Sequence, residues 1–217
     1  FSSRRRHTRY ISVTGVQTCA LPIFVSDIMG GRLIGSSDLR PVHRSVWMAC
    51  GQAVTVRVRG GDNLMIHKAL ATLLPGDVLV VDGDGDTGRA LVGEIMMSYA
   101  KSRGAVAFVI DGAIRDADSY ETKQFPCWSR GINLRGPYKD GPGSINVPVV
   151  VGGMRVNPGD IVLCDGDGVV AVPPEMAMQV AQKAQEKVDA ERSTLAAIAA
   201  GTYSAPWVDE ALKAKGL

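Results

Sequence analysis

GEIMMSYAKSRGAVAFVIDGAIRD, residues 93–116, is the stretch of the chain that decides its fold. Its first part, residues 94–102, predicts a helix that begins just after Gly93. Residues 105–110 form an uninterrupted apolar run, which is typical of a strand buried on both faces of a sheet. Because residues 77–82 form another short apolar run, the order is strand, helix, strand, and this order indicates an α/β fold.

Strands and helices continue on both sides of this unit, with glycine or proline at almost every junction. Apolar residues alternate with polar ones where a half-buried strand is predicted and recur at helical spacing where a helix is predicted. The elements predicted in this way are a strand within residues 46–58, a helix at 63–74, strands at 147–151 and 160–163, and an alanine-rich helix at 174–200. We therefore predict one α/β domain over residues 25–217, with a C-terminal helical segment from about residue 174.

The composition is that of one globular domain. The chain has 217 residues, of which 46% are hydrophobic and 21% are charged, so it can bury a substantial core. No run approaches the roughly 20 apolar residues that a membrane span needs. The cysteines Cys19, Cys50, Cys127 and Cys164 show no Cys-x-x-Cys spacing, which argues against a zinc site or a disulfide framework. They are interpreted as free thiols of a cytoplasmic protein.

The positive charge of the chain lies in its first residues. Residues 1–24 hold four arginines and no acid, so the formal net charge of +2 becomes −2 without them. Arg4-Arg5-Arg6-His7 would suit a nucleic-acid-binding arm or a signal peptide, but neither an apolar run nor further basic residues follow. The segment VTGVQTCALPI at residues 13–23 resembles a translated sequencing adapter. We exclude residues 1–24 as non-native, expect the natural N-terminus to be missing, and predict neither a nucleic-acid nor a membrane partner.

Two motifs inside residues 93–116 carry the chemistry. The amides of Ile95 and Met96, at the start of the predicted helix, would bind a carboxylate with the help of the helix dipole. Arg115 and Asp116 follow the buried strand and a predicted tight turn at Gly112, at the strand end where ligands bind in open α/β sheets. A strand–helix–strand unit brings both motifs to the same edge, so Arg115 would grip the carboxylate or the adjacent keto oxygen of a small oxo acid. The alternative interpretation is a solvated turn with an exposed ion pair.

Other glycine-rich motifs indicate turns. Gly83, Gly85 and Gly88 have the spacing of a dinucleotide-binding fingerprint, but no acidic strand end follows at the required position. The two Asp-Gly-Asp-Gly segments, at residues 82–85 and 165–168, lack the downstream glutamate and the regular ligand spacing of a calcium loop. Each segment follows a Pro-Gly-Asp start, so we predict two similar strand-and-turn units in one sheet system.

Several ordered motifs together resemble one protein family. They are Gly61-Asp62-Asn63, Pro75-Gly76-Asp77, Gly93-Glu94, Gly112-Ala113-Ile114-Arg115-Asp116, Ser144-Ile145-Asn146-Val147-Pro148-Val149 and Asn157-Pro158-Gly159-Asp160. Through them the chain resembles, over almost all of residues 25–217, the family that unites the bacterial regulator of ribonuclease activity A with divalent-metal 4-hydroxy-4-methyl-2-oxoglutarate and 4-carboxy-4-hydroxy-2-oxoadipate aldolases. The resemblance implies an α/β fold of the swivelling β/β/α type, with subunits in homotrimers or in hexamers of paired trimers and a site near a subunit interface.

In the aldolase branch, the resemblance also implies roles for individual residues. Those implied to bind the substrate are Gly93, Glu94, Ile95, Met96 and Arg115. Asp116 would help hold Mg²⁺ or Mn²⁺, and Glu94 would assist the water shell of the metal. A glutamate on the C-terminal helix of a neighbouring subunit would approach the metal, and Glu191 occupies that position here. The catalytic residues implied in this way are Arg115, Asp116 and Glu94.

The resemblance thus implies a lyase that cleaves a 4-hydroxy-2-oxo acid to pyruvate and a second oxo acid, with oxaloacetate decarboxylation as a related activity. The regulator branch is similar but has a neutral residue in place of the metal-binding aspartate, whereas Asp116 is present here. A noncatalytic binding protein on the same fold is the alternative. Arg40, Arg135 and Lys139 are candidates for contact with a distal carboxylate, and residues 137–143 are interpreted as a surface loop.

Overall fold

The computed structural model of the protein describes residues 22–45 and 47–217. The strands are β1 (Arg40–Pro41), β2 (Ala49–Val58), β3 (Asp77–Asp82), β4 (Ala90–Val92), β5 (Ala107–Ile114), β6 (Cys127–Ile132), β7 (Gly143–Ile145), β8 (Val149–Val151), β9 (Met154–Val156), β10 (Ile161–Cys164) and β11 (Val169–Val172). The helices are α2 (Pro22–Ile28), α3 (Leu64–Leu70), α4 (Glu94–Ser102), α5 (Ala117–Thr122), the short 3₁₀ helix η1 (Pro174–Met176), α6 (Ala177–Ala199) and α7 (Pro206–Ala214).

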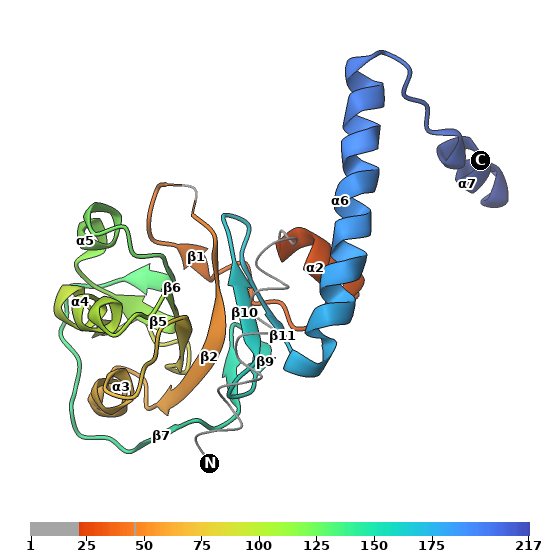
Figure 1. Ribbon diagram of the computed structural model, residues 1–217. Coiled ribbons are helices and arrows are strands. Elements are labelled where there is room, and N and C mark those ends of the chain that lie inside the picture. Colours follow the sequence, from red (N-terminus) through yellow and green to blue (C-terminus); the bar gives the residue numbers. More distant parts are fainter. Residues whose placement is uncertain (1–21, 46) are drawn as a thin grey trace.

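Most of the strands belong to one sheet. Within the described residues, nine strands form a sheet whose main path is β1-β6-β5-β3-β2-β10-β11, with β4 beside β5 and β7 beside β2 (Figure 1). β8 and β9 form a separate hairpin. β3 and β5 run parallel, with Val78 opposite Ala107, and α4 lies on the connection between them. Every residue of β5 is buried, as expected for a parallel strand covered on both faces. The predicted strand–helix–strand unit and the α/β fold are confirmed.

Apolar layers cover both faces of the sheet. On one face, side chains such as Leu79, Phe108 and Ile110 pack with α3, α4 and α5. On the other face, Val80 and Val109 pack with β8, β9, β10 and β11, because the sheet curls and its last strands fold over the central ones. Figure 1 shows α3 to α5 on one side of the sheet, while α2 and α6 pack on the outer side of β10 and β11. Apolar packing on both faces therefore holds β5, whose carboxyl end leads into Arg115 and Asp116.

The structure corrects the prediction of a tight turn at Gly112. β5 continues through Gly112 to Ile114 because β4 and β6 both pair with its last residues, including Ala113. Gly112 permits close packing here: a Cβ atom built on it would lie 2.9 Å from Leu91 Cδ1. The two residues that follow Ile114, and not a turn at Gly112, mark the end of the strand.

Other boundaries also differ from the predicted ones. The helix predicted at residues 63–74 ends at Leu70, after which Thr72 Oγ1 donates to the backbone oxygen of Ala69 at 2.7 Å. The strand predicted within residues 46–58 begins at Ala49, and Val46 lies outside the described residues. The strands predicted at 147–151 and 160–163 and the helix at 174–200 are confirmed with shifted ends. α5, α7 and several three-residue strands were not predicted, because short elements contain too few periodic positions.

The two Pro-Gly-Asp units have the same local structure, as the sequence predicted. Leu74 N donates to Asp77 Oδ2 at 2.7 Å, and Asn157 N donates to Asp160 Oδ2 at 2.8 Å. The strands that begin in these units, β3 and β10, lie on the two sides of β2. The repeat therefore supplies two neighbours of one central strand.

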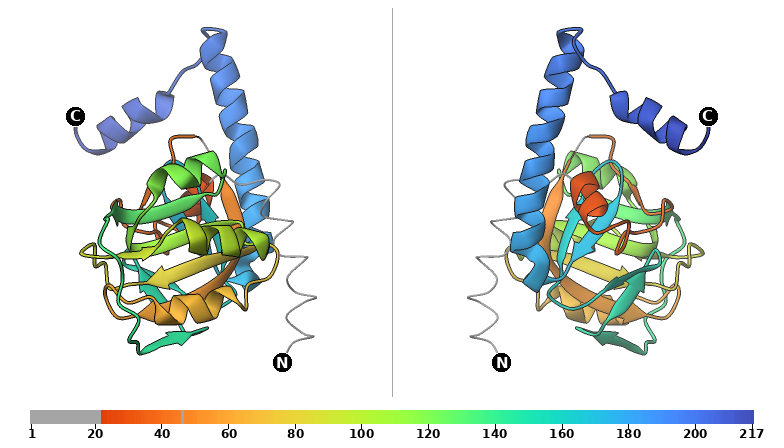
Figure 2. Two further views of the ribbon diagram at one scale, coloured as in Figure 1. Left: turned by 90° about the vertical axis from the view of Figure 1, so that its left-hand side faces the viewer. Right: turned by 90° about the vertical axis from the view of Figure 1, so that its right-hand side faces the viewer.

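The first half of α6 packs on the domain, and the second half leaves it. Its buried residues are Ala177, Val180, Ala181 and Ala184. The remainder of α6, which carries the exposed Glu191, and then α7 project away from the sheet (Figures 1 and 2). None of the helices formed by residues 22–45 and 47–217 combines the length and the apolar character needed to cross a bilayer.

α2 begins inside the segment that we excluded as non-native. Phe24 and Val25 are buried with residues of β10, β11 and α6. Residues 1–21 lie outside the described part of the chain, and the adapter origin of residues 1–24 stays a prediction.

A first prediction concerns the close contact between β2 and the turn before β3. A Cβ atom built on Gly51 would lie 2.4 Å from the backbone oxygen of Gly76 and 2.9 Å from Val78 Cγ2. Gly51→Ala is therefore expected to lower the free energy of unfolding by about 1–3 kcal/mol, as overpacking does. Urea denaturation measures the loss. Gly166→Ala is the control, since nothing lies within 4 Å of a Cβ built there; equal losses in both variants would contradict this explanation.

Candidate active site

The predicted site forms where β4, α4 and β5 meet. β4 pairs in parallel with the end of β5, and Arg115 N donates to the backbone oxygen of Val92 at 3.0 Å. Gly93 then adopts an extended conformation (φ −152°, ψ −166°) and leads directly into α4. The structure thus brings the start of α4 beside Arg115 and Asp116, as the strand–helix–strand order predicted.

Asp116 joins the two motifs through a hydrogen bond. Its Oδ2 accepts the Glu94 N–H at 2.9 Å, which places the carboxylate at the positive end of the α4 dipole. Asp116 itself has a left-handed backbone (φ 57°, ψ 41°) immediately before α5. Aspartate enters this region more readily than most non-glycine residues do. The turn at Asp116 therefore directs its carboxylate toward α4 and away from its own helix.

The amides of Ile95 and Met96 are the next donors at the start of α4. The first four N–H groups of a helix have no carbonyl partner within it, and Asp116 takes the one at Glu94. The Ile95 side chain is 83% exposed, whereas Met96 is 7% exposed and packs in the core. The buried Met96 side chain anchors the first turn of α4, at the edge of the sheet where the amides of Ile95 and Met96 lie. An anion on these amides would lie next to the Asp116 carboxylate and would need a nearby positive charge.

Arg115 supplies positive charge at this point. Its Nε lies 3.7 Å from Asp116 Oδ2, and its side chain is 43% exposed. A Cβ atom built on Gly93 would lie 2.9 Å from Arg115 Cγ, 3.1 Å from Arg115 Nε and only 2.6 Å from Asp116 Oδ2. Glycine at position 93 is therefore what allows the guanidinium and the carboxylate to lie together at the helix start.

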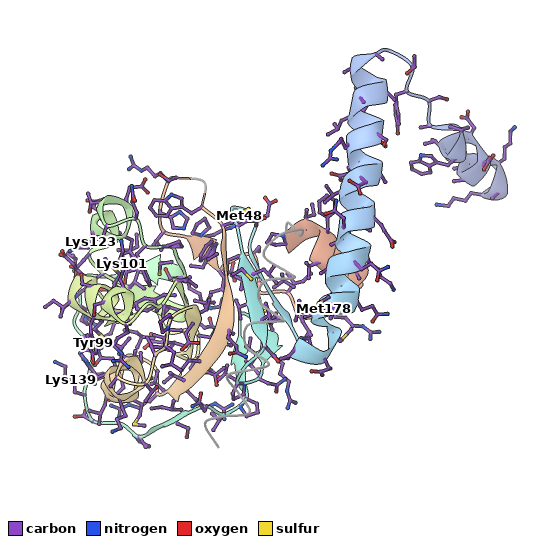
Figure 3. All side chains as sticks on the ribbon, in the orientation of Figure 1. Met48, Tyr99, Lys101, Lys123, Lys139 and Met178 are labelled. Carbon is purple, nitrogen blue, oxygen red and sulfur yellow. The ribbon has the colours of Figure 1, made fainter. Side chains whose placement is uncertain are left out.

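Glu94 pairs with the far end of α5. Its Oε1 is 3.2 Å from Lys123 Nζ, and Lys101 Nζ donates to the backbone oxygen of Lys123. Figure 3 labels both lysines in the region where α4 and α5 lie beside each other. Because both partners of the Glu94–Lys123 pair are more than two-fifths exposed, the pair adds little stability. The pair instead places the positive charge of Lys123 beside Glu94, the second acid of the site.

The acids present suit a cation that prefers oxygen ligands. Mg²⁺ is usually held by one or two carboxylates while it keeps several waters, and Asp116 and Glu94 are two such donors on adjacent segments. The described residues contain no group of three or more His, Cys, Asp or Glu side chains arranged to hold a metal. Glu191 belongs to α6, which lies on the other side of the sheet from α4 and α5 (Figure 1). Its role at a neighbouring subunit stays a prediction.

The segment at residues 133–141 borders Arg115 on its other side, and the sequence indicated only Arg135 and Lys139 of it as candidate ligand contacts. A Cβ atom built on Gly136 would lie 3.6 Å from Arg115 Nη1. Arg89 Nη1 donates to the backbone oxygen of Gly136 at 2.6 Å, and the Arg89 guanidinium lies 3.9 Å from the centre of the Tyr138 ring. The glycine and proline content predicted a surface loop at residues 137–143, but it gave no sign of the bond between Arg89 and Gly136, which lie 47 positions apart.

Asp62 holds the far end of this segment. Its buried carboxylate accepts the N–H groups of Leu64 at 3.0 Å, Asp140 at 2.7 Å and Gly141 at 2.9 Å. Burial by itself raises the pKa of Asp62, but the three N–H donors and the Arg59 guanidinium outweigh burial, so the pKa lies below its ordinary value. The ionised form of Asp62 is therefore the one that the fold stabilises.

The three basic residues considered for a distal carboxylate lie in different places. Arg40 belongs to the edge strand β1 and pairs with the middle of β6. Lys139 lies near His67 of α3, whose pKa is lowered by burial and, to a smaller extent, by the Lys139 charge (Figure 3). Arg135 belongs to the segment that borders Arg115, and its backbone oxygen accepts Ala90 N at 2.9 Å. Arg135 is therefore the candidate whose backbone is tied to the site.

Comparison with known proteins defines the class of this chain. Residues 24–171 match the family described as RraA-like, Aldolase/RraA. Over 163 residues the chain is 39% identical to a Halalkalibacterium halodurans protein named "Putative 4-hydroxy-4-methyl-2-oxoglutarate aldolase", with 75% of this chain and 77% of that protein covered. The fold and the site are those of an α/β protein with an arginine–aspartate pair at a helix start. The chain belongs to the RraA-like family.

Solved structures agree with this assignment. An uncharacterized protein from Pseudomonas syringae pv. tomato has a TM-score of 0.79 at 26% identity, with 89% of this chain and 91% of that chain covered. The structure described as the RNA-processing inhibitor RraA from Thermus thermophilis has a TM-score of 0.65 at 27% identity, with 71% of this chain and 93% of that chain covered. The family resemblance and the fold class predicted from the sequence are confirmed, whereas the homotrimer and the roles of the site residues stay predictions.

Gly93→Ala tests whether the bare backbone at position 93 allows the Asp116–Glu94 contact. The added methyl group would displace the Asp116 carboxylate, and a hydrogen bond to a charged group contributes about 1.5–3 kcal/mol. We expect the Glu94 amide hydrogen to exchange with solvent about tenfold faster or more, measured by NMR. Gly131→Ala is the control, because its Cβ would meet Thr87 Cγ2 at an ordinary 3.5 Å. Unchanged exchange at Glu94 in Gly93→Ala would refute this account.

Asp62→Asn tests the anchoring of the bordering segment as a function of pH. Because the folded-state pKa is lowered, ionised Asp62 stabilises the fold fully above its unfolded-state pKa of about 3.9. That contribution is lost as the pH falls through the lowered folded-state pKa. We expect the variant to be less stable by about 1–3 kcal/mol at pH 7, where an amide would face three N–H donors. Denaturation from pH 7 to pH 3 should show the difference narrowing below about pH 4; a difference that widens there would contradict the sign.

Proposed function

We propose that the protein is a divalent-metal-dependent aldolase. Its substrate would be a 4-hydroxy-2-oxo acid such as 4-hydroxy-4-methyl-2-oxoglutarate or 4-carboxy-4-hydroxy-2-oxoadipate, its products pyruvate and a second oxo acid, and oxaloacetate decarboxylation a related activity. The observation that carries the proposal is the position of the Asp116 carboxylate at a helix start beside a guanidinium: its Oδ2 lies 2.9 Å from the backbone N of Glu94 and 3.7 Å from Arg115 Nε. The name of the Halalkalibacterium halodurans relative supports the same reaction.

The substrate would bind through the end that becomes pyruvate. Its carboxylate would accept hydrogen bonds from the amides of Ile95 and Met96, where the α4 dipole favours an anion. The neighbouring keto oxygen would then face the Arg115 guanidinium, which is held beside Gly93. Two fixed points of contact orient the rest of the molecule away from the helix, which is the positioning that a bond cleavage requires.

A divalent cation belongs to this proposal. The groups that would hold Mg²⁺ or Mn²⁺ are Asp116, with Glu94 near its water shell, and Glu191 of the partner subunit. A bound ion of this kind supplies Lewis-acid polarisation of the keto group. Carboxylate oxygens of Asp116 and Glu94 are the donor type that these ions prefer, which supports the choice of metal.

The reaction itself breaks the C3–C4 bond of the substrate. The 4-hydroxyl group loses its proton to a water beside Glu94, and its oxygen becomes the carbonyl of the second oxo acid. The electron pair of the C3–C4 bond moves into the enolate of pyruvate, and protonation of C3 completes that product. Arg115 stabilises the negative charge that develops on the enolate oxygen. Lys101 and Lys123 are not required as Schiff-base lysines and serve the contacts between α4 and α5.

We also propose assembly into homotrimers or hexamers in the cytoplasm. Glu191 lies on the projecting part of α6, so it would serve the site of a neighbouring copy rather than its own. Exposed apolar side chains on and after this part of α6, including Leu195, Ile198, Trp207 and Leu212, support contact with another chain. Cys127 and Cys164 are buried free thiols, which fits a reducing compartment.

A noncatalytic regulator is the second candidate. The likeness to the RNA-processing inhibitor RraA from Thermus thermophilis favours it, because that protein shares the fold. Such a protein would keep the fold but would release no pyruvate and would be indifferent to the Asp116 carboxylate. Asp116 therefore distinguishes the two candidates.

The aldolase proposal predicts metal-dependent release of pyruvate. Purified protein is expected to release pyruvate from 4-carboxy-4-hydroxy-2-oxoadipate and from oxaloacetate with Mg²⁺ or Mn²⁺ and to lose this activity in EDTA, as a coupled lactate dehydrogenase assay would record. Asp116→Asn is expected to lower kcat/KM by about 100-fold or more, the scale of losing a charge-stabilising group. Asp118→Asn, two residues along in the exposed first turn of α5, is the matched control. Absence of metal-dependent release from either substrate would overturn the proposal.

A further inference from the structure

We propose that Gly136 determines how large a substrate the site accepts. The absence of a side chain at this position leaves room beside the end of the Arg115 guanidinium, and the distal half of a longer 2-oxo acid would extend into that room. This inference rests on the proposed function, because it takes the pyruvate end of the ligand to lie at the start of α4. It assigns a specificity role to a residue that lies just before the surface loop predicted at residues 137–143.

The direction of the ligand follows from the course of the Arg115 side chain. A Cβ built on Gly93 would lie 2.9 Å from Arg115 Cγ and 3.1 Å from its Nε, whereas a Cβ built on Gly136 would lie 3.6 Å from its Nη1. The guanidinium therefore extends from the start of α4 at one end to Gly136 at the other. A ligand whose carboxylate is on the α4 amides and whose keto oxygen faces Arg115 would point its remaining carbons along the guanidinium toward Gly136.

Three hydrogen bonds hold the segment around Gly136 in place. Arg89 Nη1 donates to the Gly136 backbone oxygen at 2.6 Å, and Ala90 N donates to the backbone oxygen of Arg135 at 2.9 Å. Asn133 N donates to the backbone oxygen of Ile114 at 2.9 Å, which ties the segment to the end of β5. Because these bonds join the segment to β4, to β5 and to the residue before β4, it cannot withdraw when a larger group enters. The space beside the Arg115 guanidinium is therefore set by the size of the side chain at position 136.

Further contacts stiffen the same segment from outside. The Arg89 guanidinium stacks on Tyr138 at 3.9 Å from the ring centre, and Arg59 lies on the ring at 5.4 Å. Tyr138 N also donates to the backbone oxygen of Gly61 at 2.8 Å. Arg89 therefore acts as a positioning residue, which places both a cation and a rigid backbone behind Gly136. A distal carboxylate would meet positive charge from Arg89 and Arg115 together.

A substitution at Gly136 would act through volume. The φ angle of Gly136 lies outside the left-handed range that strains other residues, so the backbone accepts a side chain there. An alanine methyl would make an ordinary contact with Arg115 Nη1, and a valine side chain would fill the space that the distal half of the ligand needs. A larger side chain at position 136 should therefore weaken the binding of a longer ligand more than that of a shorter one.

The test compares two ligands that share the pyruvate end. Pyruvate and 2-oxoadipate are titrated into the full chain in MgCl₂ by calorimetry, with the unaltered protein, Gly136→Ala and Gly136→Val. We expect Gly136→Val to weaken 2-oxoadipate binding about tenfold more than pyruvate binding, because its side chain would overpack against the distal half of the longer acid, with Gly136→Ala intermediate. Gly131→Ala, whose Cβ would contact Thr87 and not Arg115, is the matched control and should alter neither affinity.

Arg89→Met tests the positioning role separately. Loss of the bond to Gly136 should weaken 2-oxoadipate more than pyruvate, and Arg89→Lys, which keeps the charge without the fork of donors, should restore part of the difference. Equal weakening of both ligands by Gly136→Val, or no weakening of either, would overturn the inference while leaving the aldolase proposal intact. Failure of the unaltered protein to bind either acid would overturn both, so the two proposals fail in different ways.

Discussion

The hydrogen bond from the Glu94 amide to the Asp116 carboxylate is the contact on which the site depends. It joins the second residue after β5 to the first residue of α4, and both segments gain from it. The helix obtains an acceptor for an N–H that would otherwise lack one, and the carboxylate obtains the positive end of the helix dipole. Because the contact leaves no space for a side chain between the two segments, residue 93 has to be glycine.

Charge balance explains the other residues around this contact. Asp116 and Glu94 place two acids at an edge of the sheet that would also receive an anionic ligand. Arg115 lies 3.7 Å from Asp116 Oδ2, and Lys123 lies 3.2 Å from Glu94 Oε1, so each acid has a cation beside it. The α4 dipole adds a further positive contribution at the same place. In the proposed function, an edge balanced in this way would hold a carboxylate and still keep an oxygen ligand for a divalent cation.

The segment around Gly136 completes the site from the opposite side. It comes to Arg115 because residues that precede and begin β4 hold it through Arg89 and Ala90, and because β5 and β6 pair almost to their ends. These contacts link parts of the chain that lie far apart in sequence. The same sheet that presents Arg115 and Asp116 therefore also determines how much space lies beside them.

The sequence by itself determined the strand–helix–strand centre, the repeat of two Pro-Gly-Asp units, and the joint position of Gly93 to Met96 with Arg115 and Asp116. These features are local or follow from strand order, and apolar runs with glycine and proline stops encode both. Only the tertiary structure decided that β5 continues through Gly112, since its partners β4 and β6 supply the hydrogen bonds. It also decided that Asp116 caps α4 and that Gly136 borders Arg115. Such contacts depend on distances between segments that no periodicity records, and they arise when burial of the two apolar layers brings those segments together.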